Sequence, residues 1–179
     1  MWMRRILSYL ALAGAAALLI SFSIPSFDGG KPSIAGRTAQ NFSFTLDGQP
    51  TNLAALQGKI VVLNFWATWC PPCVDETPSL ERMYTDLKPL GVTVLGVSVD
   101  DDASAYQKFL VDHGITFPTY RDANKKIPIS YGTAMYPETY IISRNGKIER
   151  KLIGEQDWSS PQMLAYLTAL AKGQTPTTF

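Results

Sequence analysis

The sequence predicts one α/β domain in which helices cover both faces of a mixed β-sheet, preceded by an apolar N-terminal segment. Two apolar runs, 59–66 and 92–99, are each followed by a stretch in which apolar residues recur at helical spacing. Two further strand-like segments then flank Asn145-Gly146, and a last helical stretch follows them. Strand–helix units followed by a hairpin and a helix indicate a sheet with both parallel and antiparallel strands.

The first predicted elements are strands. Residues 41–46 (NFSFTL) alternate in polarity and are followed by Asp47-Gly48, which is typical of an edge strand or a hairpin. Residues 59–66 (KIVVLNFW) are almost continuously apolar, as expected for a strand that is covered on both faces.

Two helices are predicted around the second buried strand. After Cys70, apolar residues fall at helical spacing until Gly91. Residues 92–99 (VTVLGVSV) form the next strand, and three acidic residues, 100–102, precede an amphipathic helix that ends at Gly114.

The C-terminal third of the chain predicts a hairpin and a helix. Residues 138–143 and 147–153 flank Asn145-Gly146, which is a strong signal for a tight hairpin turn. Residues 158–171 read as the last helix, with Ser159 or Ser160 as its N-cap and Pro161 in its first turn.

Composition excludes several classes of function. The chain has 179 residues, a net charge of +1 and 11% aromatic residues, and it is rich in Val, Ile and Leu, which speaks against disorder. The first 30 residues hold only three charges, which leaves 14 basic and 14 acidic residues, and no net charge, in the rest. Nucleic acid is therefore not an expected partner, since a polyanion binder needs a concentrated basic field. Two cysteines and one histidine cannot form a tetrahedral zinc site of four Cys, or of two Cys and two His, within one chain, and we expect neither metal nor cofactor.

The N-terminal segment predicts export. Residues 6–24 are a mainly apolar run of 19 residues, which as a helix spans about 28 Å, close to the thickness of a bilayer core. Arg4 and Arg5 before it favour a cytoplasmic N-terminus and an exported domain. We interpret 1–25 as a membrane anchor, 26–36 as a Gly/Pro/Ser-rich linker and 37–174 as the domain, in a single-pass protein of the inner or plasma membrane that faces the periplasm or cell exterior. A cleaved signal peptide, for which residues 21–23 are a poor cleavage site, and a buried helix are the alternatives.

The chemical centre is Cys70-Pro71-Pro72-Cys73, which follows a buried strand and opens a helix. Unpaired backbone N–H groups and the positive end of the helix dipole stabilise a thiolate there, and such thiols have pKa values of roughly 3.5–7.5 against ~8.5 when free. Cys70, before the first turn, is expected to be the exposed nucleophile, and Cys73, one turn later, the partly buried resolving thiol. The two prolines stiffen the loop at little cost, because N–H groups of the first turn lack helical partners. Alternatives are a metal bridged between two chains and a static structural disulfide.

The run 61–73 (VVLNFWATWCPPC) and the later 136–140 (YPETY) resemble the thioredoxin superfamily. The resemblance covers about 36–172 and is strongest to membrane-anchored TlpA/ResA-like thiol:disulfide oxidoreductases and the related CcmG/DsbE-like cytochrome c maturation proteins. It implies a thioredoxin-like core of four or five strands, with an extra N-terminal hairpin and an inserted strand–helix unit around 92–114.

The resemblance also implies roles for individual residues. Pro137 matches a cis-proline that lies against the active disulfide, where the backbone of Tyr136 can pair with an extended client strand. Asn64 stands where ordinary thioredoxins have a buried, proton-transferring Asp. Glu76 matches a Glu of TlpA/ResA-like proteins and shares a helix face with Cys73. Our hypothesis is that Glu76 moves the proton, with a pKa raised by partial burial; the alternative is a solvated helix carboxylate.

The residues around the motif are expected to have different roles. Trp69 is expected to contribute to a docking surface for substrates, together with Pro71, Pro72, Tyr136 and Pro137. Trp66 is expected to be a core residue, and His113 to be solvated or to cap a helix.

The function we expect is a membrane-tethered thiol:disulfide oxidoreductase that reduces protein disulfides outside the cytoplasm. Its clients would include the thiols of apocytochrome c, and a transmembrane thiol donor would reduce it again. Peroxide reduction is an alternative because peroxiredoxins share the fold, but their P-x-x-x-T/S-x-x-C pattern fails at both cysteines. A non-catalytic module that binds clients and keeps a static disulfide is the third reading.

Overall fold

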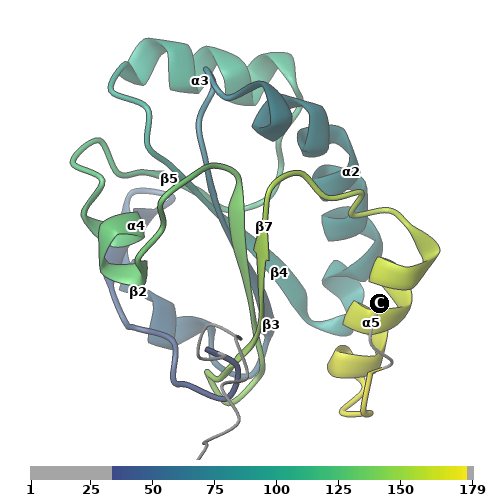
Figure 1. Cartoon of the computed structure of the whole chain (residues 1–179). Helices are drawn as coiled ribbons and strands as arrows, with labels where there is room; N and C mark the ends of the chain where they lie inside the picture. Colours follow the sequence, from purple (N-terminus) through teal and green to yellow (C-terminus); the bar gives the residue numbers. More distant parts are fainter. Residues whose placement is uncertain (1–33, 177–179) are drawn as a thin grey trace, which may run out of the picture. The chain divides into compact units, whose positions relative to one another are not determined.

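The computed structural model describes residues 34–176 (Figure 1). The predicted anchor, 1–25, and the linker up to residue 33 lie outside these residues. None of the helices within 34–176 is long and apolar enough to cross a membrane. The elements in chain order are β1 (Ser43–Leu46), β2 (Gln49–Asn52), η1 (Leu53–Leu56), β3 (Ile60–Trp66), α2 (Pro71–Leu87), η2 (Lys88–Leu90), β4 (Val92–Ser98), α3 (Ala103–Asp112), β5 (Thr119–Arg121), α4 (Lys126–Tyr131), β6 (Glu138–Ile142), β7 (Ile148–Ile153) and α5 (Pro161–Ala171).

The main sheet has five strands in the order β5-β4-β3-β6-β7. The central strand β3 pairs in parallel with β4 and antiparallel with β6, while β5 is parallel to β4 and β7 antiparallel to β6. β1 and β2 form a separate antiparallel hairpin. The mixed sheet, the extra hairpin and the thioredoxin-like order of elements are therefore as predicted.

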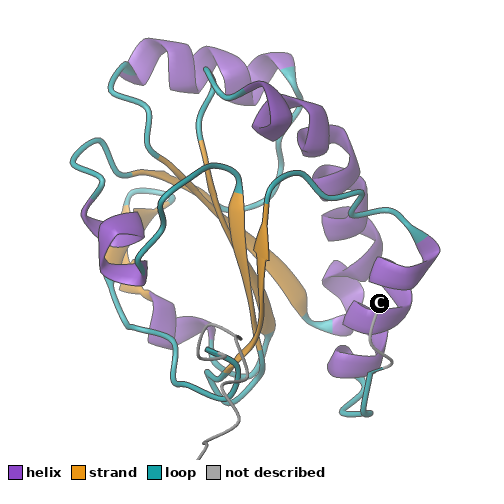
Figure 2. Ribbon diagram, viewed as in Figure 1, coloured by secondary structure: helices purple, strands orange, loops and turns teal. Residues whose placement is uncertain are grey.

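Alternate residues of β3 are buried against different layers, because successive side chains of a strand point to opposite faces. Ile60 and Val62 pack with residues of α2 and α5. Val61, Leu63 and Phe65 pack with residues of the β1–β2 hairpin, η1 and α4. Figure 2 shows α2 and α5 on one side of the sheet and the short α4 on the other. Helices therefore lie on both faces of the sheet. On the second face the β1–β2 hairpin and η1 pack beside α4.

The short elements β5 and α4 have no counterpart among the predicted ones. β5 has three residues at the sheet edge, too few to show a period. α4 has six residues, contains Pro128, and follows Lys125 in the left-handed conformation (φ 58°). Both are held by pairing and packing with distant parts of the chain.

The segment before β1 is bound to the hairpin turn between β6 and β7. Thr38 bridges Lys147, the N–H of Gly36 donates to the carbonyl of Ile148 (2.7 Å), and that of Ala39 to the carbonyl of Gly146 (2.9 Å). The chain therefore joins the sheet at the end where β3 begins.

Arg144 holds the same end of the domain together. Its guanidinium donates hydrogen bonds to the backbone carbonyls of Gly58, Leu90 and Ala171. These carbonyls belong to the loop before β3, to η2 before β4 and to the end of α5, so one side chain binds three segments of the chain.

Candidate active site

The two cysteines lie where the chain passes from β3 into α2. Cys70 is the N-cap residue of α2 with an extended backbone (φ −100°, ψ 103°), and Pro71 and Pro72 occupy the next two positions. The N–H groups of Cys73 and Val74 donate to the carbonyl of Cys70 (3.0 and 3.1 Å). The prolines fit because they have no N–H to leave unpaired in the first turn.

Cys70 and Cys73 form a disulfide with an S–S distance of 2.15 Å. Cys70 is 5% exposed and Cys73 1%. The expectation of an exposed Cys70 is therefore wrong for the disulfide form, because both cysteines pack in one apolar cluster with Trp66 and Ala67, against which Tyr136 also packs. Cys70 is still the more exposed of the two residues, as the sequence predicts.

The loop before β6 borders this cluster. The Tyr136–Pro137 peptide bond is cis, as predicted. The ring of Tyr136 meets that of Trp69 edge-on, with centroids 6.1 Å apart, and Trp69 is 59% exposed. The carbonyl of Pro137 accepts from Gly154 (2.9 Å), whereas no backbone hydrogen bond joins Tyr136 to the rest of residues 34–176. An exposed aromatic surface and unpaired backbone groups thus lie beside the disulfide.

Glu76 is buried, with 2% of its surface exposed, so it is not a solvated helix carboxylate. Three N–H groups donate to it. The amide of Asn64 donates to Oε1 (2.8 Å), and the backbone N–H of Gln156 and the indole N–H of Trp158 donate to Oε2 (both 3.1 Å). Asn64 thus positions the carboxylate, and it also donates to Thr139 (2.9 Å).

Burial raises the pKa of Glu76 from 4.5 to about 7, although the three hydrogen bonds oppose this rise. The negative charge of Glu155 adds a small further increase in the pKa. A carboxyl with this pKa can hold or release a proton near neutral pH, as the sequence-based hypothesis requires.

Trp158 is a site residue that the sequence did not predict. It was expected inside the last helix, but α5 begins at Pro161 with Ser160 as N-cap, and Trp158 precedes it. Its side chain is fully buried, and its indole N–H reaches Glu76 from 82 positions away. No local pattern indicates so distant a hydrogen bond.

Glu138, directly after the cis-proline, is a second buried carboxylate that the sequence did not indicate. It accepts hydrogen bonds from Thr133 (2.6 Å) and Tyr140 (2.7 Å) and forms an ion pair with Lys151 (3.0 Å). These contacts join β6 and β7 to the loop that carries Tyr136.

Other expectations concern residues outside the centre. Trp66 is a core residue, as expected, and Asp75 is exposed. His113 caps α3 and stacks on Phe109, with ring centroids 4.0 Å apart. Within residues 34–176, no three His, Cys, Asp or Glu side chains are grouped so that they could hold a metal ion.

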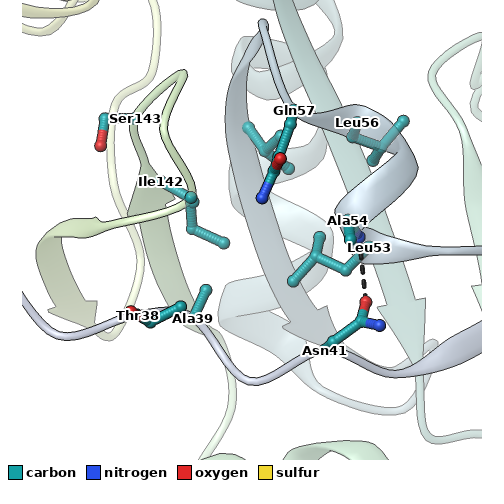
Figure 3. Close-up of a pocket in the computed structure, with 11 residues that line it drawn as sticks. Thr38, Ala39, Asn41, Leu53, Ala54, Leu56, Gln57, Ile142 and Ser143 are labelled. Atoms are coloured by element: carbon teal, nitrogen blue, oxygen red, sulfur yellow. Dashed lines mark hydrogen bonds between the residues drawn. The ribbon is translucent and has the colours of Figure 1, made fainter.

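A hollow of about 110 Å³ lies where β3 begins (Figure 3). It is lined mainly by apolar side chains, among them Leu53, Leu56 and Ile142, and Asn41 at its rim accepts a hydrogen bond from Ala54 (2.9 Å). It contains none of the predicted site residues.

Known proteins resemble this chain over most of the described domain. The model of the AhpC/TSA family matches residues 35–151. The thiol-disulfide oxidoreductase ResA of Bacillus thuringiensis is 37% identical over 133 residues, which cover 74% of this chain and 76% of the relative. ResA of Halalkalibacterium halodurans is 36% identical over 148 residues, 82% of each chain. Among solved structures, a Chlorobium tepidum protein assigned as thiol:disulfide interchange protein DsbE has a TM-score of 0.65 and 30% identity, covering 68% of this chain and 86% of its own.

Proposed function

The chain belongs to the AhpC/TSA family and is a thiol-disulfide oxidoreductase, and we propose that it reduces disulfides of other proteins while tethered to a membrane. The observation that supports the exchange chemistry in this proposal is a disulfide at the N-terminus of α2 with a buried carboxyl of pKa about 7 on the same helix. Helix N-terminal amides lower the pKa of a thiol, and a carboxyl with a pKa near neutral can accept the proton of the second thiol.

The reaction begins with the reduced pair. The thiolate of Cys70 attacks one sulfur of the client disulfide, and the other client sulfur leaves as a thiolate. Cys73 then attacks Cys70 in the mixed disulfide, which releases the client as a dithiol and leaves Cys70–Cys73 oxidised. Two electrons have passed to the client, so a thiol donor must reduce the pair again before the next cycle.

Glu76 is proposed to accept the proton of the Cys73 thiol before Cys73 attacks. It lies one turn after Cys73 in α2, and its pKa of about 7 lies below that of a free thiol but above that of an ordinary carboxyl. Its hydrogen bonds with Asn64, Gln156 and Trp158 hold the carboxyl in place during the transfer.

The docking surface is proposed to consist of Trp69, Tyr136 and Pro137, with Pro71 and Pro72 at its edge. Trp69 offers exposed aromatic surface, and the unpaired backbone of Tyr136 can pair with an extended client segment. Apocytochrome c thiols as client, a transmembrane thiol donor, and a location outside the cytoplasm on an N-terminal anchor are parts of the proposal that follow from the sequence.

Trapping tests the chemistry. In the full chain, Cys73→Ala should accumulate a mixed disulfide between Cys70 and client proteins, because the resolving thiol is missing, whereas Cys70→Ala should trap far less. Equal trapping by both variants would contradict the assigned roles. If a Cys70→Ser/Cys73→Ser double variant keeps full activity in cells, the protein is a binding module and the proposal fails.

The reduction potential tests the direction of electron flow. A value near that of thioredoxin, about −270 mV, supports a reductant, and one near −120 mV indicates an oxidant. Rapid catalytic consumption of hydrogen peroxide by the reduced chain would instead favour peroxide reduction.

A further inference from the structure

A second buried carboxylate lies near the cysteines, at the end of β4. Asp100 is 2% exposed, whereas the side chain of the next residue, Asp101, is 78% exposed. The following residue, Asp102, caps α3. Three consecutive acidic residues therefore have three different environments, and only Asp100 faces the protein interior.

Asp100 binds the loop that leads to Cys70. The backbone N–H of Thr68 donates to both carboxylate oxygens (3.1 and 3.2 Å), and the hydroxyl of Thr68 donates to Oδ1 (2.7 Å). The hydroxyl of Ser98 donates to Oδ2 (2.6 Å). One carboxylate thus binds both the backbone and the side chain of a residue two positions before Cys70.

The charge of Asp100 has no cationic partner on its carboxylate among the described residues. Arg121 donates instead to the backbone carbonyls of Asp100 and Asp101 (3.1 and 3.2 Å). Burying a carboxylate with uncharged donors alone is costly unless its oxygens are well satisfied. An apolar residue at position 100 could not accept the hydrogen bonds that Thr68 donates to Asp100.

We infer that Asp100 is a positioning residue for thiol-disulfide exchange: by holding Thr68 it fixes residues 67–69 and keeps Cys70 at the positive, N-terminal end of α2. This inference rests on the proposed function, in which Cys70 is the attacking thiol. A loop released from Asp100 would let Cys70 move away from this end of the helix, and its thiolate would lose the stabilisation that the helix dipole gives.

The test distinguishes the effect of the hydrogen bonds between Asp100 and Thr68 from the effect of the negative charge of Asp100. The pH dependence of alkylation of reduced Cys70 is measured by mass spectrometry in the full chain and in three variants, Asp100→Ala, Asp100→Asn and Thr68→Val. The matched control is Asp101→Asn, which removes a neighbouring exposed charge. The other titratable groups around this end of the sheet are unchanged throughout; they include Glu76, Tyr106, Arg121, Asp122, Tyr136 and Glu138.

Asp100→Ala should raise the pKa of Cys70 by about one unit, which leaves about tenfold less thiolate below that pKa. Asp100→Asn should keep the wild-type pH profile of alkylation, because the amide oxygen of the new side chain still accepts a hydrogen bond from Thr68. Thr68→Val should shift the profile in the same direction as Asp100→Ala, and it provides the test if Asp100→Ala does not fold. The control should match the wild type.

The inference is overturned if Asp100→Ala leaves the profile unchanged, or if the Ala and Asn variants both lower the pKa of Cys70, since loss of the negative charge alone would then be responsible. Failure of the proposed function looks different: both cysteines of the wild type would then titrate like free thiols, near 8.5.

Discussion

Replacing Trp158 with Phe should shift the pH dependence of the second step of exchange. The substitution keeps a large apolar side chain in place but removes the indole N–H that donates to Glu76. That hydrogen bond favours the ionised carboxylate, so its loss must raise the pKa of Glu76 above about 7. A hydrogen bond to a charged group contributes about 1.5–3 kcal/mol, and one pKa unit corresponds to about 1.4 kcal/mol. The expected rise in the pKa is therefore about 1–2 units.

The assay follows resolution of a mixed disulfide between Cys70 and a small peptide from about pH 5 to about pH 10. The midpoint that depends on Glu76 should move from about 7 towards about 8–9 in Trp158→Phe. Alkylation of Cys70 in the reduced chain over the same pH range gives the titration of this thiol, so that it can be distinguished from that of Glu76.

Trp66→Phe is the matched control for this prediction. It makes the same chemical change near the cysteines, but the indole N–H of Trp66 is buried with no hydrogen-bond partner among the described residues. Its midpoint should stay at the wild-type value. An unmoved midpoint in Trp158→Phe, or an equal shift in both variants, would refute the role given to the Trp158–Glu76 contact.

Three other variants test further features through the free energy of unfolding, measured with denaturant. Glu76 has a pKa of about 7 in the fold against 4.5 ordinarily, so it stabilises the fold fully below about pH 4.5 and loses that contribution as the pH rises through 7. The stability of the wild type relative to Glu76→Gln should therefore fall by about 3 kcal/mol from pH 4 to pH 8, and parallel curves would contradict the burial of this charge. Gly96→Ala should lower stability by about 1–3 kcal/mol, because its Cβ would lie 3.0 Å from Phe117 and 3.1 Å from the indole nitrogen of Trp66; wild-type stability would show that these rings yield freely. Arg144→Ala should lower the free energy of unfolding by about 1–3 kcal/mol, because three hydrogen bonds to backbone carbonyls are lost. An unchanged unfolding midpoint would show that these hydrogen bonds do not stabilise the fold.

The parts of the fold that the sequence predicted are those with strong local signals. β3 and β4 are continuous apolar runs, and Asn145-Gly146 marks the hairpin between β6 and β7. β5 and α4 gave no such signal, since both are short and depend on their neighbours. Local patterns therefore predict the central strands and the long helices better than the sheet edge.

The candidate site likewise has residues that the sequence indicated and residues that it did not. The cysteines, Glu76 and Pro137 belong to short motifs, so sequence alone identified them as candidates. Two of the three donors that hold Glu76 come from 80 and 82 positions away, and only the folded chain brings them to the carboxyl. Similarly, the run of three acidic residues after β4 indicated a helix start, which Asp102 provides, but not that Asp100 would be buried.

The pairing of Thr38 with Lys147 has a practical consequence for handling the protein. β3 spans about 20 Å from Ile60 to Trp66, and the two cysteines follow its far end. A surface coupling or a reporter joined at Ile34 would therefore meet the domain at the opposite end of the sheet, beside the β6–β7 turn. Attachment at this point should leave the sulfurs free to meet large polypeptides in solution.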